Sequence, residues 1–339
     1  MRTIHCRVPC LPACSQVCVL TCLAVWGTMG VVQQLLQSHR VMLVGQESYL
    51  WKAWHDSMDP KLPRPPANPK VDYPKVQDDT EYPTWTPRRL QQLLEEPTTS
   101  CRRLTSLGGS YLCEDCHTCQ RDGNKYICFD PDVRPVPGNC LVYSFGVGGE
   151  MSWDIAMRNL NCSVFAFDMT LMGWGNSMFA EGLHFLDLGL TSFNSDDTIN
   201  MTAAGNSVQH WESRKAYFRS LETIRDILGH KDRPIDVLKM DIEFMEWKVL
   251  VDILSTPEKF TVLQDVRQIA LEIHLDGLRN STAAERVEEA RKVEAVLEGL
   301  HTHGFHLVHT ELNTAQQVHA EIRGQVLPLY RESLFLRRL

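Results

Sequence analysis

The sequence is poor in positive charge, and no basic tract follows its N-terminal segment. Its 339 residues include 34 Lys and Arg against 42 Asp and Glu, which gives a formal net charge of −8 at pH 7. Proteins that bind nucleic acid contact the phosphates with clustered Lys and Arg side chains. The charge pattern therefore argues against a nucleic-acid partner, and a soluble acidic surface explains it.

The sequence also lacks an apolar run as long as the roughly 18–20 residues of a comfortable transmembrane helix. An apolar stretch runs from about Val17 to Val32 and follows Arg2 and Arg7. This pattern is typical of a signal peptide, or of a short signal anchor if it is not cleaved. We therefore expect residues 1–32 to direct the chain to the secretory pathway, as a secreted protein or a type II protein of the Golgi or ER lumen. Membrane contact is expected only through this segment.

Residues 33–97 lack the pattern of a packed core. Prolines recur from Pro60 to Pro97, and such a run tends to stay extended, so we expect a stem or linker here. Near its end, Thr86 and Pro87 predict the cap and first turn of a short helix that ends at Glu96.

Residues 98–139 are predicted to form a cysteine-rich module ahead of the main domain. The tripeptide Asp122-Gly123-Asn124 is typical of a hairpin turn. A zinc site or a c-type haem attachment would match the pattern of Cys113, Cys116, His117 and Cys119. In an exported protein disulfides are favoured over both, and their connectivity stays open.

Two further features agree with export. Seven cysteines follow the leader, namely Cys101, Cys113, Cys116, Cys119, Cys128, Cys140 and Cys162. Because seven is odd, one thiol is expected to be free or to pair with another chain. Sequons for N-glycosylation occur at Asn161, Asn200 and Asn280.

Residues 140–339 are predicted to form the main domain, and the stretch from Leu141 to Asp168 predicts one βαβ unit. It reads LVYSF, then the glycine cluster GVGGE, then a helical MSWDIAMRNLNCS and a second strand, VFAFD. Gly146 and Gly148 have no Cβ, so the backbone can turn sharply and touch a ligand. Asp168 lies about twenty residues beyond the loop, the offset at which a carboxylate meets ribose hydroxyls.

This loop differs from the dinucleotide-binding fingerprint. Met151 stands where the third glycine belongs, and Glu150 would repel a pyrophosphate. An acidic neighbourhood suits a cationic ligand better. S-adenosylmethionine fits because it combines a ribose for Asp168 with a sulfonium and an ammonium group. We therefore predict this small-molecule methyl donor at Gly146, Gly148, Glu150 and Asp168.

Strands and helices continue to alternate towards the C-terminus. The predicted strands are Leu183–Leu186, Ile235–Met240, Gln268–Ile273, Gly304–Val308 and Glu332–Leu336, and the predicted helices are Glu212–Leu228, Glu246–Leu254 and Ala283–His303. Repeated β-then-α segments predict an α/β fold, a mainly parallel sheet with helices on both faces. Ligands bind such sheets at the carboxyl ends of the strands.

Acidic residues and one histidine gather at those strand ends. Asp241 follows one strand, with Glu243 and Glu246 after it, and His274 ends another strand. The three acids can bind a divalent cation, orient an acceptor hydroxyl or supply a base, although Glu246 is better explained as the complement of a helix N-terminus. His274 can take a proton near neutral pH. We expect Asp241, Glu243 and His274 to be catalytic and assign no metal site.

The chain carries, in order, the motifs CLVYSFGVGGEMSWDIAM, VFAFD, HFLDLGL, PIDVLKMDIEFMEWKVL, QIALEIH and GFHLVHTELN, preceded by LLEEP, CRRLTSLGG and DGNKYICFDP. From about Thr86 to the C-terminus these motifs resemble those of FkbM-type, methyltransferase-like proteins. The resemblance implies a Rossmann-like class I S-adenosylmethionine-dependent methyltransferase fold. Its sheet would be mostly parallel and seven-stranded, with the last strand antiparallel.

The resemblance also implies roles for single residues. Gly146 and Gly148 would lie under the methionine part of the donor, and Asp168 would hold its ribose. Asp187 would lie on the adenine side, and Asp241 beside the transferred methyl group. Phe244 replaces the glycine of the family's D-x-E-G-x-E pattern and would narrow the acceptor site.

The resemblance implies an enzyme that methylates hydroxyls, so we expect O-methylation of a glycan or another acceptor of the secretory pathway. One alternative is a catalytically inactive binding protein that keeps the methyltransferase fold. A second is a Golgi glycosyltransferase, for which Asp130-Pro131-Asp132 would be the D-x-D triplet that binds metal and nucleotide sugar.

Overall fold

A mixed β-sheet organises the part of the chain that the computed structural model describes, residues 85–113, 119–171, 175–201, 212–243, 245–279, 282–313 and 318–338. All of these residues fall in one of the two units into which the chain divides, residues 63–114 with 118–339. The predicted leader and most of the predicted stem lie outside the described residues, as do Cys116, His117 and Phe244.

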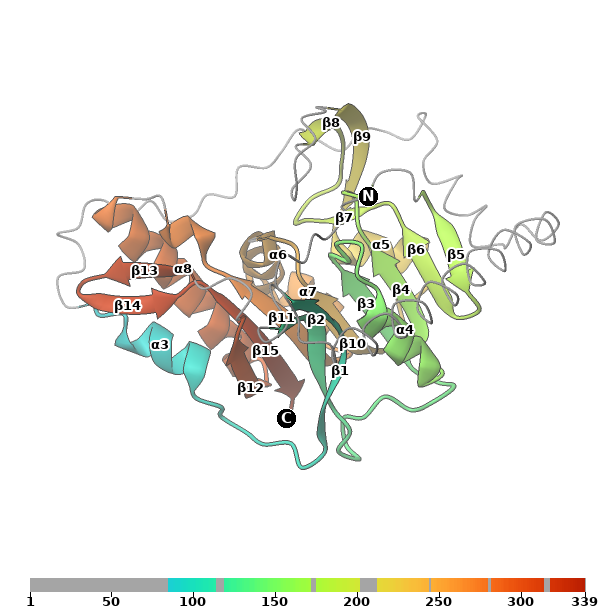
Figure 1. The fold of residues 1–339 in the computed structure, drawn as a ribbon, viewed down its shortest axis with the longest axis horizontal. Helices are drawn as coiled ribbons and strands as arrows, with labels where there is room; N and C mark the ends of the chain where they lie inside the picture. Colours follow the sequence, from blue (N-terminus) through green and yellow to red (C-terminus); the bar gives the residue numbers. More distant parts are fainter. Residues whose placement is uncertain are drawn as a thin grey trace, which may run out of the picture. The chain divides into compact units, whose positions relative to one another are not determined.

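The sheet has eight strands in the order β12-β15-β11-β10-β3-β4-β6-β5 (Figure 1). Their bounds are β3 (Leu141–Phe145), β4 (Ser163–Phe167), β5 (Ser177–Ala180), β6 (Leu183–Leu186), β10 (Ile235–Met240), β11 (Val266–His274), β12 (Phe305–Leu312) and β15 (Tyr330–Arg337). Strands β6, β4, β3, β10 and β11 run parallel, so their carboxyl ends share one edge. The last strand, β15, is antiparallel to both of its neighbours, as the resemblance implied.

The predicted count of seven strands is wrong, because β5 adds an eighth at one edge. It pairs antiparallel with β6 and is four residues long. Its sequence, SMFA, has no alternation of apolar and polar residues, and its Met178 and Phe179 are exposed. Without a buried face the segment carries no strand periodicity that a sequence could reveal.

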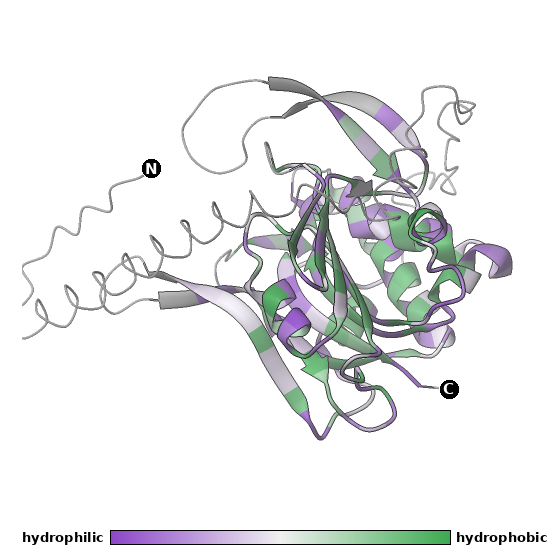
Figure 2. Ribbon diagram, turned by 90° about the vertical axis from the view of Figure 1, so that its right-hand side faces the viewer, coloured by the Kyte–Doolittle hydropathy of each residue, from purple (hydrophilic) through white to green (hydrophobic). Residues whose placement is uncertain are grey.

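Helices cover both faces of the sheet, as predicted. They are α3 (Arg88–Glu95), α4 (Ser152–Asn159), α5 (Leu221–Ile227), α6 (Met245–Leu254), α7 (Pro257–Phe260) and α8 (Ala283–Thr302). The side of β15 that carries Leu334 and Leu336 packs in one core with Trp153 and Met157 of α4. The side that carries Phe335 faces α3 and α8. Figure 2 shows hydrophobic residues concentrated along the strands between these layers.

An antiparallel hairpin, β1 (Leu104–Cys113) and β2 (Cys119–Cys128), completes the α4 side and lies across β11 and β15 (Figure 1). The predicted turn at Asp122-Gly123-Asn124 is wrong, because these residues lie inside β2 opposite Gly108 and Ser110. Gly108 and Gly123 have positive φ angles, and a Cβ on Gly108 would lie 2.4 Å from the backbone of Trp153. The glycines therefore let the hairpin press against the start of α4 instead of turning the chain.

Two disulfides join described cysteines, in agreement with the prediction of disulfides. Cys101 pairs with Cys128 and ties the two ends of the hairpin together. Cys140 pairs with Cys162 and joins the residues that precede β3 and β4. The three predicted domain boundaries stay predictions, but the hairpin packs into the core of the sheet rather than apart from it, since Ile127 and Cys128 are fully buried there.

The helix predicted over Glu212–Leu228 is only half right. Residues 212–219 form a strand, β9 (Glu212–Arg219), which pairs with β7 (Gly189–Leu190) and β8 (Ser195–Met201). Helix α5 begins only after Ser220, whose hydroxyl accepts a hydrogen bond from the Thr223 amide. The apolar periodicity belongs to the residues after this cap, and the charged segment before it has none. A further hairpin, β13 (His319–Ile322) and β14 (Gln325–Pro328), was also not predicted.

The start of α3 differs from the prediction. At α3 the N-cap is Pro87, with no side-chain cap, so the predicted capping role of Thr86 is wrong.

None of the helices in the described ranges is long and apolar enough to cross a membrane.

Candidate active site

The glycine loop connects β3 to α4 and reaches β10. The Gly146 amide donates to the Phe167 carbonyl oxygen at 2.9 Å. A Cβ on Gly146 would lie 1.5 Å from the carbonyl oxygen of Asp241, whereas one on Gly148 would meet nothing within 4 Å. Gly146 is therefore required by the protein's own packing, and Gly148 leaves open space in which a ligand can lie.

Asp168, at the end of β4, meets this loop as predicted. The Gly148 amide donates to Asp168 Oδ2 at 2.8 Å, and the amide and hydroxyl of Thr170 both donate to Oδ1 at 2.6 Å. A carboxylate oxygen has two lone pairs, so Oδ2 can accept one more hydrogen bond. Asp168 as a whole is 6% exposed.

Of the two other predicted donor-binding acids, Glu150 lies in the loop itself and Asp187 lies at the end of β6. The carboxylate of Glu150 accepts hydrogen bonds from the Ser152 amide at 3.0 Å and from the Ser110 hydroxyl at 3.1 Å. It thus caps α4 and contacts the β1–β2 hairpin. Asp187 follows β6, is half-buried, and its amide donates to the side-chain oxygen of Asn176 at 2.7 Å.

Acidic residues form a row across the carboxyl edge of the sheet. Glu272 of β11 lies directly opposite Glu332 of β15, which lies opposite Glu311 of β12. Asp241 extends this row beyond the end of β10. Like charges that face each other on neighbouring strands repel, so the row needs protons or cations to be stable.

Lys125 of β2 supplies the main cation. Its Nζ lies 3.1 Å from Asp241 Oδ2, 3.0 Å from Glu272 Oε2 and 2.5 Å from Glu332 Oε1. Burial alone would lower the pKa of this ammonium, but the charges of Asp241, Glu332 and Glu272 outweigh it and raise that pKa well above the usual value. Lys125 therefore stays charged although its side chain is 2% exposed.

Two of the carboxyl groups around Lys125 have pKa values that are shifted in opposite directions. Burial alone would raise the pKa of Asp241, but the charges of Lys125 and Lys239 hold it well below its usual range. Burial raises the pKa of Glu332 well above its usual value, and the charges of Glu272 and Asp241 add to this although Lys125 opposes it. The cluster thus favours the ionised form of Asp241, whereas burial favours the protonated form of Glu332.

A second buried lysine links Asp241 to the glycine loop. Nζ of Lys239, on β10, donates to the Gly146 carbonyl oxygen at 2.6 Å and lies 3.5 Å from Asp241 Oδ2. Neither Lys125 nor Lys239 was singled out from the sequence. The only signal for Lys239 is a charge within a strand whose burial is complete, and Asp236 of the same strand shows the same signal.

His274 and Glu246 form a buried pair beside this cluster. Nδ1 of His274 lies 3.0 Å from Glu246 Oε1, which also accepts from the Ile242 amide at 2.7 Å. Glu246 lies in the first turn of α6, where the prediction placed it, but it binds an amide of the preceding turn and also orients the imidazole. Burial alone would lower the pKa of His274, but the hydrogen bond and charge of Glu246, with those of other acids, raise it to about 9.

Glu243 is the third predicted catalytic residue, and it lies on the solvent-exposed side of His274. Its carboxylate is 78% exposed and lies 3.8 Å from Nε2 of His274. Its backbone has a φ of 54°, and partial burial raises the pKa of its carboxyl group. The structure thus brings Asp241, Glu243 and His274 together, with Glu243 nearest to solvent.

Two groups of side chains in the described ranges have ligand atoms close enough for a metal ion. The first is Asp241, Glu272 and His274, whose ligand atoms lie within 4.8 Å of one another, but Lys125 already contacts two of them. The second includes Cys101 and Cys128, which are joined in a disulfide and cannot ligate a metal as thiolates.

The D-x-D triplet has a structural role at its first residue. The carboxylate of Asp130 is 4% exposed and accepts hydrogen bonds from the amides of Arg102 and Arg103. A carboxylate that is buried and bonded in this way does not face a nucleotide sugar. The burial of Asp130 therefore argues against the glycosyltransferase alternative, which needed this carboxylate to bind metal and nucleotide sugar.

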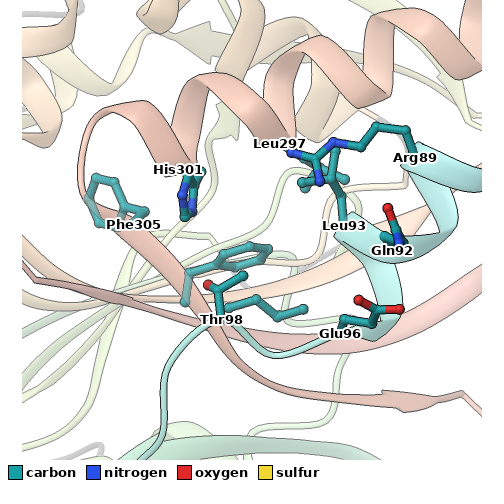
Figure 3. Close-up of a pocket in the computed structure, with 10 residues that line it drawn as sticks. Arg89, Gln92, Leu93, Glu96, Thr98, Leu297, His301 and Phe305 are labelled. Atoms are coloured by element: carbon teal, nitrogen blue, oxygen red, sulfur yellow. The ribbon is translucent and has the colours of Figure 1, made fainter.

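A shallow pocket lies elsewhere, between α3, the end of α8, β12 and β15 (Figure 3). Arg89, Glu96 and His301 line it together with apolar residues such as Leu297 and Phe305. None of the predicted site residues lines it. The predicted catalytic and donor-binding residues therefore lie at the carboxyl edge of the sheet and not in this pocket.

Comparison with known proteins agrees with the resemblance found in the sequence. A family model described as "Methyltransferase domain" matches residues 75–324. The human "Probable methyltransferase-like protein 24" is 28% identical over 172 residues, which cover 50% of this chain and 42% of that protein. The rat protein of the same name is 28% identical over 172 residues, 50% of this chain and 43% of its own length. The chain thus matches less than half of each relative, and no solved structure gives a significant match.

The two glycines of the loop give a matched pair of variants. We expect Gly146→Ala to lower the free energy of unfolding by several kcal/mol, because its Cβ would collide with the Asp241 carbonyl oxygen. Gly148→Ala should cost only about 1–2 kcal/mol, the penalty for an L-residue at positive φ. Urea denaturation of both variants measures the difference, and equal losses would contradict the assigned packing.

Proposed function

The chain belongs to the methyltransferase-domain family, and we propose that it transfers a methyl group from S-adenosylmethionine to a hydroxyl group. One observation carries this proposal: the Gly148 amide is bonded to Asp168 at the end of the next strand, beside open space. The order and directions of β6, β4, β3, β10, β11, β15 and β12 support a class I fold with β5 as an addition.

The residues of the loop fit the methyl donor. Oδ2 of Asp168 keeps one lone pair that can accept a ribose hydroxyl, and the open side of Gly148 leaves room for the methionine part. Asp187 would serve the adenine side. Glu150 adds negative charge near the loop, although its carboxylate also caps α4. When bound, the donor supplies a sulfonium whose methyl group is electrophilic.

The residues at the ends of β10 and β11 fit an acceptor hydroxyl. Asp241, ionised and partly exposed, would orient it, and Glu246 holds Nδ1 of His274 so that Nε2 points to the site. With the donor bound, the acceptor oxygen would bond to the methyl carbon as the carbon–sulfur bond breaks, and Nε2 of the neutral imidazole would take the hydroxyl proton. Holding oxygen and methyl group in line removes much of the barrier.

The main alternative is a binding protein that keeps the fold without turnover. The raised pKa of His274 favours it, because an imidazole that holds its proton at neutral pH cannot act as a base. Donor binding without methyl transfer to any glycan or protein fraction of the secretory pathway would support this alternative.

We further propose that the acceptor is a glycan or another molecule of the secretory pathway. The predicted leader, the disulfides Cys101–Cys128 and Cys140–Cys162, and the sequon at Asn161 support this location. Asn161 is exposed, in a turn with a φ of 63°.

The location predicts N-glycosylation at Asn161 when the full chain is expressed in eukaryotic cells. Removal of N-glycans with an endoglycosidase should increase gel mobility, and Asn161→Gln should reduce that shift. Mobility that the enzyme leaves unchanged would contradict passage of this sequon through the glycosylating lumen.

Donor binding can be measured by isothermal titration of the full chain with S-adenosylmethionine. We expect the wild type to bind and Asp168→Ala to bind at least tenfold more weakly, because a hydrogen bond to a carboxylate contributes about 1.5–3 kcal/mol. Asp132→Ala removes an exposed carboxylate outside the loop and should bind like the wild type. A wild type that does not bind the donor would eliminate the proposed function.

The pKa of His274 predicts the dependence of turnover on pH. If Nε2 accepts the proton, kcat/KM should rise about tenfold per pH unit below pH 9 and level off above it, because the group is protonated below its pKa of about 9. Glu246→Gln removes the charge that raises this pKa, so its profile should level off at lower pH. A wild-type profile that is flat between pH 6 and 9 would exclude His274 as the base.

A further inference from the structure

Lys125 is bound in the way that a metal ion would be bound. Its ammonium group has three N–H donors, and three carboxyl oxygens lie around it, on Asp241, Glu272 and Glu332. These oxygens come from three different strands or strand ends, β10, β11 and β15, while the lysine comes from the hairpin. The three donors are therefore matched to three acceptors.

The surrounding side chains have the chemistry of a divalent-cation site. Asp241, Glu272 and His274 present two carboxylate oxygens and one imidazole nitrogen within 4.8 Å of one another. Carboxylate oxygens and imidazole nitrogens both bind divalent metal ions of the first transition row. The ammonium lies 3.0–3.1 Å from the two carboxylates of this set, so a metal ion and Lys125 cannot occupy it together.

We propose that Lys125 is the built-in cation of the acceptor site, in the place that a divalent metal ion would otherwise fill. It is a positioning residue, because it acts through Asp241 rather than on the reacting atoms. The ammonium neutralises the row of acids and fixes the Asp241 carboxylate towards the acceptor. This inference rests on the proposed function for its catalytic part, but the cation site itself does not.

A lysine that only stabilised the fold would explain the contacts but would not predict a metal site in its absence. Removal of the ammonium leaves a gap beside the carboxyl groups of Asp241, Glu272 and Glu332 and near the imidazole of His274. Such a gap should take up a divalent transition metal ion, whereas the wild type should not.

The test is a titration of the full chain with Co²⁺, followed by its visible absorption. We expect Lys125→Ala to bind one Co²⁺ per chain at least 100-fold more tightly than the wild type, and Co²⁺ to raise its unfolding temperature. Lys292→Ala is the matched control, because Lys292 pairs with Glu288 and Glu289 on α8, outside the site. It should bind Co²⁺ no better than the wild type.

A second variant guards against loss of the fold. Lys125→Ala combined with Glu332→Gln removes one acid from the cluster and keeps Asp241, Glu272 and His274, so it should also bind Co²⁺. Lys125→Ala combined with Glu272→Gln should bind at least tenfold more weakly than Lys125→Ala alone. Tight binding by the wild type would overturn the proposal. The proposal would also be overturned if neither Lys125→Ala nor the double variant Lys125→Ala with Glu332→Gln bound Co²⁺. This holds also if excess Co²⁺ does not make these variants fold.

A measurement of turnover tests the positioning role separately. With secretory extract as acceptor, Lys125→Ala should release S-adenosylhomocysteine at least tenfold more slowly, Mn²⁺ should restore part of this rate, and the affinity for S-adenosylmethionine should change less than threefold. Chelators should leave the wild type unchanged. Unchanged turnover in Lys125→Ala would overturn the positioning role, whereas a wild type that binds no donor would overturn only the proposed function.

Discussion

The structure depends on one buried ammonium group. Three neighbouring strands place Glu272, Glu332 and Glu311 directly opposite one another, an arrangement that repels itself when all three are ionised. Lys125 contacts the first two of these, while Tyr126, the next residue of β2, donates to the third at 3.0 Å. Because a buried ion pair that loses one partner costs about 3–5 kcal/mol, the hairpin and the sheet edge depend on each other.

The same charges connect the two halves of the site. Asp241 contacts Lys125 on one side and Lys239 on the other, and Lys239 also holds the Gly146 carbonyl oxygen. Asp241 therefore lies between the acceptor side and the donor loop. Glu246 orients the imidazole of His274, and Glu246, Glu272 and Asp241 raise the pKa of that imidazole.

The sequence predicted what periodicity and local motifs carry, which includes the strands of the parallel core, the glycine loop and its contact with Asp168. It missed β5 and β9, since an exposed or charged strand shows no apolar alternation. It misplaced the turn at Gly123, because a glycine needed for close packing and one needed for a turn look alike in a sequence. It could not find Lys125, whose partners lie as far as 207 residues away in the chain.

The long separation between Lys125 and Glu332 also bears on the order of assembly. During synthesis the hairpin emerges well before β15, so Lys125 has all three of its carboxyl partners only after the strand that carries Glu332 has been made. Asp241 and Glu272 precede that strand and supply the first two partners. The complete contact between the hairpin and the sheet therefore joins segments that are made far apart in time.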